Sequence, residues 1–291
     1  MKYLIVGENS LCIQLSDTLS DEIERFDIRS AIKKAIPQEA TSLLKSFEPD
    51  LLIVVGTNRS NSLLVKARRR GVKSCFFHQT LLDDRNTFIQ PTSGQKVFYD
   101  IPRSSKSSNH AFLLLDRIRN HDNYSSHENI KPKVSIIYSE AAEEKRARKL
   151  SKKLSGHSND IIYELLNISA DLPEAIDASI HSNSAISLDR FSNLFAAYTN
   201  CPTVNVYRNS LFKKANNRVS PLNKLTNNEV VKDISGNNIE LIIEEISRIL
   251  NDHQYCAGIM QSYQEIKDIV GTHPFARQAV REIVDWMEEE D

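Results

Sequence analysis

The feature that most restricts the fold of this chain lies at residues 184–207, where two short apolar segments flank one helical segment. Ser184–Leu188 is brief and mostly apolar, as is typical of a strand covered on both faces. A segment with apolar residues at helical spacing follows and ends at Cys201–Pro202. Thr203–Tyr207 is again strand-like, with β-branched residues in alternation. This order of strand, helix and strand predicts a parallel α/β sheet, whose strand ends commonly hold small anionic ligands.

The same alternation of apolar strands and amphipathic helices recurs along the chain. Lys2–Val6 is a short apolar strand, and Leu51–Val55 is a longer continuous one. Between them, the spacing of apolar residues predicts a single helix over Ile28–Phe47, running through Pro37. We expect further strands at 72–78, 96–101, 134–138 and 160–166, and further helices at 11–19, 63–70, 143–154, 172–180, 239–250, 255–270 and 273–289.

The length of the chain favours two domains. With 291 residues, 40% of them hydrophobic, it can bury two separate cores. His121–Lys133 is polar and has the composition of a linker. We therefore predict a Rossmann-like N-terminal domain at 1–125, a Rossmann-like C-terminal domain at 126–272 and a C-terminal helix at 273–291.

The charge balance argues against a nucleic-acid-binding protein. The 37 basic and 38 acidic residues give no bulk attraction to nucleic acid or to an anionic membrane. The basic cluster Lys66–Arg70 is typical of the last turn of a helix that ends at Gly71, and Glu143–Leu154 is expected to be a solvated surface helix. No apolar run reaches the roughly 18–20 residues that a membrane span requires, so we expect a cytoplasmic protein.

The sequence gives no sign of a metal or a bound cofactor. The four cysteines lie far apart and form no C-x-x-C pair, so neither a zinc site nor a disulfide framework is indicated, and no acidic metal cluster is evident. Only 8 residues are glycine, and no G-x-G-x-x-G follows the first strand. This disfavours a dinucleotide-dependent enzyme, and we predict no cofactor and no metal.

Three segments carry a family resemblance. Asn193–Pro202 reads NLFAAYTNCP and Val204–Arg208 reads VNVYR, and together they resemble the TLEAALLGTP…VVAYR segment of the bacterial lipid-A-disaccharide synthase family. Ser220–Asp233 is similar to that family's S-L-P-N…V-V-P-E segment, and Glu8 and Ser10 match its opening G-E-x-S. The resemblance implies a GT-B fold, in which two Rossmann-like domains face each other across a cleft and a C-terminal helix crosses back to the first domain.

The resemblance also implies an activity. Members of the family transfer a sugar from a UDP-sugar to an acceptor with inversion, without a metal, in lipid A biosynthesis. The implied partners are a UDP-sugar, on the side of the second domain, and a lipid-linked or other sugar acceptor, on the side of the first. The segment that the family uses to dock on membranes is shortened here, so we expect at most peripheral membrane contact. The sequence leaves open whether the protein forms a homodimer.

Five residues match implied substrate-binding positions of the family: Glu8, Ser10, Arg208, Asn223 and Asp233. From the residues alone, Asn223 is also typical of a turn, and Arg208 follows a strand that is expected to be buried. Both interpretations stay open for these two residues.

The residues that carry the family's chemistry are largely replaced. Gly56–Asn61 holds no carboxylate where the family has its catalytic aspartate, although a general base must be ionised near neutral pH. Asp83 and Asp84 are the nearest catalytic candidates, and such paired loop aspartates are also typical of solvated turns. Ser139–Glu140 stands where the family has a phosphate-binding Gly and Arg. Two hypotheses follow: a divergent glycosyltransferase, or an inactive GT-B pseudoenzyme that serves binding or assembly.

Overall fold

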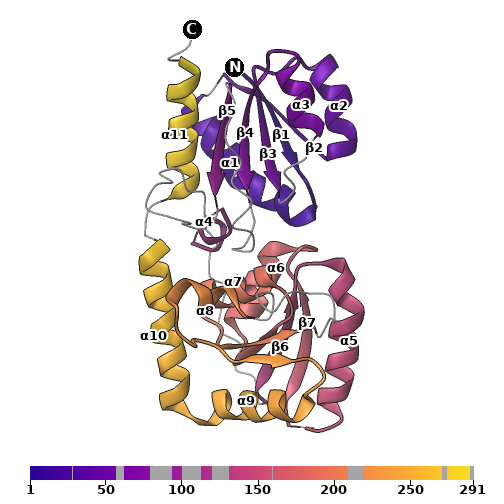
Figure 1. Ribbon diagram of the computed structural model, residues 1–291, viewed down its shortest axis with the longest axis vertical. Helices are drawn as coiled ribbons and strands as arrows, with labels where there is room; N and C mark the ends of the chain where they lie inside the picture. Colours follow the sequence, from indigo (N-terminus) through magenta and orange to yellow (C-terminus); the bar gives the residue numbers. More distant parts are fainter. Residues whose placement is uncertain are drawn as a thin grey trace. The chain divides into compact units, whose positions relative to one another are not determined.

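The chain divides into two compact units, Met1–Arg119 with Thr272–Asp291, and Asn120–Gly271. A computed structural model, shown in Figure 1, gives the structure of each. It describes residues 1–27, 29–56, 62–78, 94–99, 113–119, 131–158, 160–208, 219–270 and 274–288.

The first unit is built on a five-stranded sheet in which every strand pair is parallel, in the order β2-β1-β3-β4-β5. Its strands are β1 (Lys2–Gly7), β2 (Ala31–Ala35), β3 (Leu51–Gly56), β4 (Lys73–His78) and β5 (Gln95–Tyr99). Its helices are α1 (Ser10–Phe26), α2 (Pro37–Ser46), α3 (Ser62–Arg68), α4 (Leu113–Arg119) and α11 (Phe275–Glu288).

Both faces of this sheet are apolar, because alternate residues of each strand point to opposite sides. Leu4, Val6 and Leu52 belong to the core under α2 and α3, where they are fully buried. Ile5 and Ile53 are equally buried on the opposite face, which α1 covers. The continuous apolar strands predicted from the sequence are therefore the central strands of a sheet covered on both sides.

The C-terminal helix α11 packs on the first unit, against α1 and α4 (Figure 1). The backbone N–H of Ala276 donates to Asp116 Oδ2 at 2.6 Å, and Arg277 Nε donates to Glu22 Oε2 at 3.2 Å. Lys96 Nζ also donates to the carbonyl of Glu282 at 2.9 Å. The prediction that the last helix returns to the first domain is confirmed.

The single helix predicted over Ile28–Phe47 is wrong in its first half. Ala31–Ala35 forms strand β2, paired with β1 at the edge of the sheet, and α2 begins only at Pro37. Proline favours the first turn of a helix because its nitrogen has no hydrogen to leave unpaired there, so it starts α2 and does not lie inside a longer helix.

The second unit contains another parallel five-stranded sheet, in the order β10-β9-β8-β6-β7. Its strands are β6 (Lys133–Tyr138), β7 (Ile162–Asn167), β8 (Ser184–Ser187), β9 (Thr203–Tyr207) and β10 (Asp233–Ser235). Its helices are α5 (Ala141–Ser155), α6 (Leu172–Ile180), α7 (Arg190–Tyr198), α8 (Pro221–Thr226), α9 (Ile239–Asn251) and α10 (His253–Val270).

The two faces of the second sheet differ in polarity. Under α5 and α9 the strands contribute apolar residues such as Ile136, Ile186 and Val204 to the core. The residues that alternate with them, including Ser135 and Asn205, are buried and polar. The prediction of two Rossmann-like α/β domains is confirmed. Among the described helices, none is long and apolar enough to cross a membrane.

Candidate functional site

Two neighbouring strands of the second sheet lead into loops that diverge. β6 lies next to β8, and the chain continues from β6 to β7 on one side and from β8 to β9 on the other. In parallel α/β sheets, ligands bind at the carboxyl ends of the strands at such a point. Here the residues at this position are Ser139, after β6, and Asp189, after β8.

Asp189 joins these two loops. Its Oδ2 accepts from the Ser139 N–H at 2.6 Å, and its Oδ1 accepts from the Ser139 hydroxyl at 2.9 Å. Oδ1 also accepts from the Ser192 N–H at 2.9 Å in a capping box at the start of α7. Burial raises the pKa of Asp189 and these hydrogen bonds oppose that rise. An internal carboxyl group thus occupies the N-terminus of α7.

Two cationic side chains lie close to each other near the start of α7. Burial lowers the pKa of Arg190, the first residue of the helix. Burial also lowers the pKa of Lys224 in α8, with a further lowering by the positive charge of Arg190, while Asp233 raises it. The region beside α7 therefore carries positive charge that is partly removed from water.

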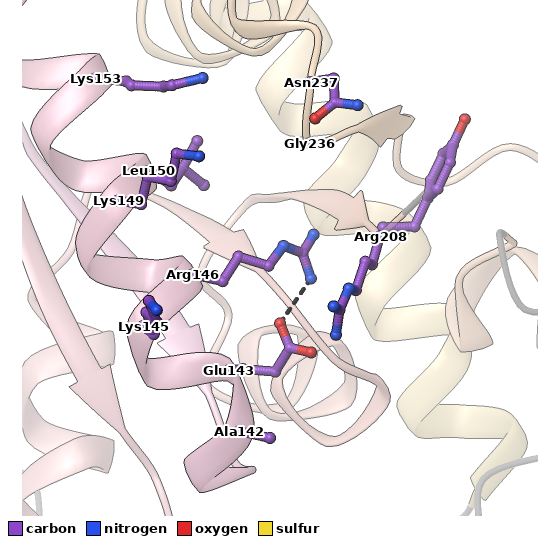
Figure 2. Close-up of a pocket in the computed structure, with 11 residues that line it drawn as sticks. Ala142, Glu143, Lys145, Arg146, Lys149, Leu150, Lys153, Arg208, Gly236 and Asn237 are labelled. Carbon is purple, nitrogen blue, oxygen red and sulfur yellow. Dashed lines mark hydrogen bonds and ion pairs between the residues drawn. The ribbon is translucent and has the colours of Figure 1, made fainter. Parts of the chain in front are cut away.

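A pocket of about 370 Å³ lies at the edge of the same sheet, between α5 and the ends of β9 and β10 (Figure 2). One wall is the exposed side of α5, and the other comes from the last residues of β9 and the turn between β10 and α9. It is lined by Ala142, Glu143, Lys145, Arg146, Lys149, Leu150, Lys153, Tyr207, Arg208, Gly236 and Asn237.

Arg146 is held in place between the helix and the sheet. Its Nη2 donates to the Val206 carbonyl at 2.6 Å, and its Nη1 donates to Glu143 Oε2 at 2.8 Å and to the Leu188 carbonyl at 3.4 Å. Gly236 leaves room for this guanidinium group, because a Cβ there would stand 3.3 Å from Arg146 Nη2. The ends of β8 and β9 are thus tied to α5 through one cation.

The pocket is strongly cationic. The pocket is lined by Lys145, Lys149, Lys153 and Arg208, and none of these four side chains has a hydrogen-bond or ion-pair partner within the described part of the chain. Glu143 is the one acidic side chain of the lining, and it is paired with Arg146 at 2.8 Å. Such a surface attracts anions, most strongly at low ionic strength.

Of the five predicted substrate-binding residues, Arg208 is the one that lines this pocket. It follows β9 directly and is exposed, and Figure 2 shows its side chain across the pocket from α5. A guanidinium group in this position is able to donate two parallel hydrogen bonds to a phosphate.

Asn223 and Asp233 lie together away from the pocket lining. Asn223 Oδ1 accepts from the N–H groups of Val230 and Val231, at 2.7 and 3.0 Å, and Nδ2 donates to the Val231 carbonyl and to Asp233 Oδ2. Asp233 Oδ1 accepts from Asn205 Nδ2 at 2.6 Å and from the Ser220 N–H at 2.9 Å. These bonds join α8, β9 and β10.

Glu8 and Ser10 lie at the corresponding point of the first sheet, where β1 is next to β3. The Glu8 N–H donates to the Val55 carbonyl at 3.0 Å, and its carboxyl group lies over Gly56, where any side chain would overlap it. Ser10 is exposed at the first position of α1. The catalytic candidates Asp83 and Asp84 lie outside the described residues.

Sequence reasoning missed several residues of the site. The lysines of α5 were expected on a solvated surface helix, although their four-residue spacing is visible in the sequence. Asp189 could have been recognised from the D-x-x-S pattern that precedes an apolar helix. Arg146 and Gly236 gave no such signal, because their partners lie far away along the chain.

No protein-family model matches this chain, and no curated protein sequence matches it. Several solved structures do match it. S. aureus MnaA with UDP is 11% identical, over 99% of this chain and 97% of that one, with a TM-score of 0.67. The kitacinnamycin glycosyltransferase is 8% identical, over 98% of each chain, with a TM-score of 0.61.

A third similar structure is the UDP-GlcNAc 2-epimerase of Methanocaldococcus jannaschii in complex with UDP-GlcNAc and UDP. It is 11% identical, over 98% of this chain and 99% of that one, with a TM-score of 0.56. The likeness extends over both sheets and the returning helix, which means that this chain has the GT-B fold that UDP-GlcNAc 2-epimerases and glycosyltransferases share.

Proposed function

We propose that this protein binds a UDP-sugar and is a divergent glycosyltransferase of the lipid-A-disaccharide-synthase type. The observation that carries the proposal is the exposed guanidinium group of Arg208 in a cationic pocket at the carboxyl end of β9. Similar structures that span the whole chain hold UDP or UDP-GlcNAc, which supports the choice of ligand. A cytoplasmic location and a lipid-linked or other sugar acceptor are part of the proposal.

In this reaction the acceptor oxygen attacks the anomeric carbon while the bond from that carbon to the diphosphate breaks on the opposite face. Negative charge then develops on the leaving UDP. Arg208 would donate hydrogen bonds to the diphosphate, and the nearby Arg146, held by the Val206 carbonyl, would add a second positive charge. No metal is required for this stabilisation.

The proton of the acceptor hydroxyl needs a base. Asp83 and Asp84 remain the proposed candidates for that role, with Glu8 and Ser10 as proposed contacts to a substrate. Asn223 and Asp233 would contribute by holding α8 and β10 in position, since their side chains already bond to each other and to the backbone.

A second candidate function is a binding or assembly scaffold without catalysis. It is favoured by Asp189, whose carboxyl group occupies the N-terminus of α7, where a phosphate would otherwise accept from backbone N–H groups. The absence of any carboxylate from Gly56–Asn61 in the sequence also favours it.

Calorimetric titration with UDP and UDP-N-acetylglucosamine tests the proposal. We expect micromolar binding, and Arg208→Ala should weaken it about ten- to a hundredfold, as expected for loss of a charge-assisted bond. Arg148→Ala is the matched control, because Arg148 lies on α5 outside the pocket and pairs with Glu144 at 2.7 Å. No binding at millimolar ligand, or equal losses in both variants, would contradict the proposal.

Release of UDP in the presence of candidate sugar acceptors distinguishes the two functions. A transferase should release UDP at a rate that falls in Asp83→Ala or Asp84→Ala while UDP affinity is kept. Tight UDP binding with no acceptor-dependent release would instead support the scaffold.

A further inference from the structure

We propose that the pocket beside Arg208 extends along α5 as a groove, and that this groove binds an elongated ligand with at least two separated phosphate groups. The groove consists of Lys145, Lys149 and Lys153 on one wall, with Arg208, Gly236 and Asn237 opposite (Figure 2). The inference rests on the proposed function in part, because the groove shares Arg208 with the proposed contact to the diphosphate; the line of three lysines is what it adds.

The spacing of charges on α5 is the first argument. Lys145, Lys149 and Lys153 follow one another at intervals of four residues, so they form one line on the helix surface. Like charges at this interval destabilise a helix, whereas an acid followed by a base stabilises it. The same helix has that favourable pattern outside the groove, in the Glu144–Arg148 pair. Arg148 and Lys152 form a further like-charged pair at this interval outside the groove, so what distinguishes the groove side is that three such charges follow one another in one line.

The length of the lysine line limits the ligand. A helix rises about 1.5 Å per residue, so Lys145 and Lys153 are separated by about 12 Å along the axis. One phosphate is too small to reach all three ammonium groups, because lysine acts on phosphate as a point donor at hydrogen-bond distance. An elongated ligand with several anionic groups along its length would neutralise all three ammonium groups.

The floor of the groove and its opposite wall, which carries Arg208, are also positive. Arg146 is fixed at the floor by the Val206 carbonyl, and Gly236 keeps the approach to it narrow but open. Asn237 comes just before the N-terminus of α9, a helix of 13 residues whose N-cap is Asn238. The positive end of the α9 dipole therefore adds to the cations of the groove.

The dimensions of the pocket favour a small molecule as the occupant. Its volume of about 370 Å³ lies within the range of small-molecule sites, roughly 300–1,000 Å³. The net charge of −1 for the whole chain also lacks the broad basic surface of a nucleic-acid-binding protein.

Titration with tripolyphosphate at low ionic strength tests the inference, with orthophosphate as the comparison. We expect tripolyphosphate to bind more tightly than orthophosphate, and Lys149→Ala and Lys153→Ala each to weaken it about fivefold. Lys152→Ala, an exposed lysine of the same helix outside the groove, should change it less than about twofold. Equal losses in all three variants, or no preference over orthophosphate, would overturn the inference.

Lys149→Glu separates ligand binding from folding. The new acid would alternate with Lys145 and Lys153, so the melting temperature should rise by about 1–2 °C while tripolyphosphate binding is lost. Retention of tripolyphosphate binding in this variant would also overturn the inference. UDP binding serves as a separate measurement, because it should depend on Arg208 and should persist in Lys153→Ala whether or not the lysine line binds phosphate.

Discussion

The two sheets have the same parallel topology of five strands but are held to their helices by different interactions. In the first unit, the central strands are apolar on both faces. In the second, one face of the sheet is lined by buried polar side chains that bond to one another, to the turn after α6, to α7 and to the N-cap of α8. The first sheet depends mainly on burial of apolar surface, and the second depends also on specific hydrogen bonds.

The polar contacts of the second unit connect strands to the segments that pack on them, Ser182 in the turn after α6 and Asn193 in α7. The Ser135 and Ser182 hydroxyls are 2.6 Å apart, and Asn193 Nδ2 donates to Ser187 Oγ at 3.0 Å. In the first unit, several buried hydroxyls such as that of Ser74 have no partner among the described residues, although Ser16 Oγ donates to the Ile13 carbonyl at 2.7 Å. In the second unit, Asn193 Oδ1 is one of the buried atoms without a partner there. Hydrogen bonds need one arrangement, whereas apolar contacts tolerate several, so the second unit is better suited to hold loops in fixed positions.

The largest effect should come from Asn223→Ala in the second unit. The change removes four side-chain hydrogen bonds and leaves the buried N–H of Val231 without its acceptor. We expect a loss of about 3 kcal/mol in the free energy of unfolding. Hydrogen exchange of β9 and β10 amides measures it. Asn228→Ala, at an exposed position nearby, should cost less than about 0.5 kcal/mol.

The comparison predicts that this loss stays within the second unit. Trp286, in α11, is the single tryptophan of the chain and belongs to the first unit. The midpoint of its fluorescence change with denaturant should therefore be nearly the same in Asn223→Ala and in the unchanged protein. A large shift of that midpoint would show that the two units unfold together.

The next effect concerns the pH dependence of the first unit. Asp116, in α4, is buried against the N-terminus of α11, and this burial raises the pKa of Asp116 to about 6. The folded state therefore holds a proton more tightly than the unfolded state, so the contribution of this group to stability is present below about pH 4 and is lost as the pH rises through 6. The change is on the order of 3 kcal/mol.

The variant Asp116→Asn tests whether the contribution of this group to stability falls as the pH rises. The amide oxygen is able to accept from the Ala276 N–H, but the side chain no longer titrates. The stability of the unchanged protein minus that of the variant, followed by Trp286 fluorescence, should fall between pH 4 and pH 7. A difference that stays constant, or that rises with pH, would contradict the assignment.

Most of the fold could be predicted from the sequence, because the period of the apolar residues reports directly on strands and helices. Leu51–Val55 is apolar throughout and is the central strand β3. Ala31–Ala35 misled the prediction, because its lysines and alanines fit a helix as well as a strand, and only pairing with β1 decides between them. Such pairing is nonlocal and cannot be read from a local pattern.

The site could be predicted only in part, for the same reason. Arg208 was proposed because it matches an implied substrate-binding position of the family that the chain resembles, and it directly follows a strand of a parallel sheet, where ligands commonly bind. The cation beside it, Arg146, is placed by a carbonyl 60 residues away along the chain. Asn223 and Asp233 were expected to contact substrate, but the sequence could not reveal that each would bond to the other.

The smallest predicted effect is also the most direct test of the comparison between the units. Ser74 and Ser135 are both fully buried in strands, Ser74 in β4 and Ser135 in β6. Ser135→Ala removes the partner of Ser182 and should cost about 1 kcal/mol. Ser74→Ala removes a hydroxyl group without a partner among the described residues and should leave stability unchanged or raise it by up to about 1 kcal/mol. Each is measured by hydrogen exchange of its own strand, since both variants lose the same atom and differ only in what that atom bonds to. Equal losses at the two positions would mean that both sheets depend on their polar groups to the same degree.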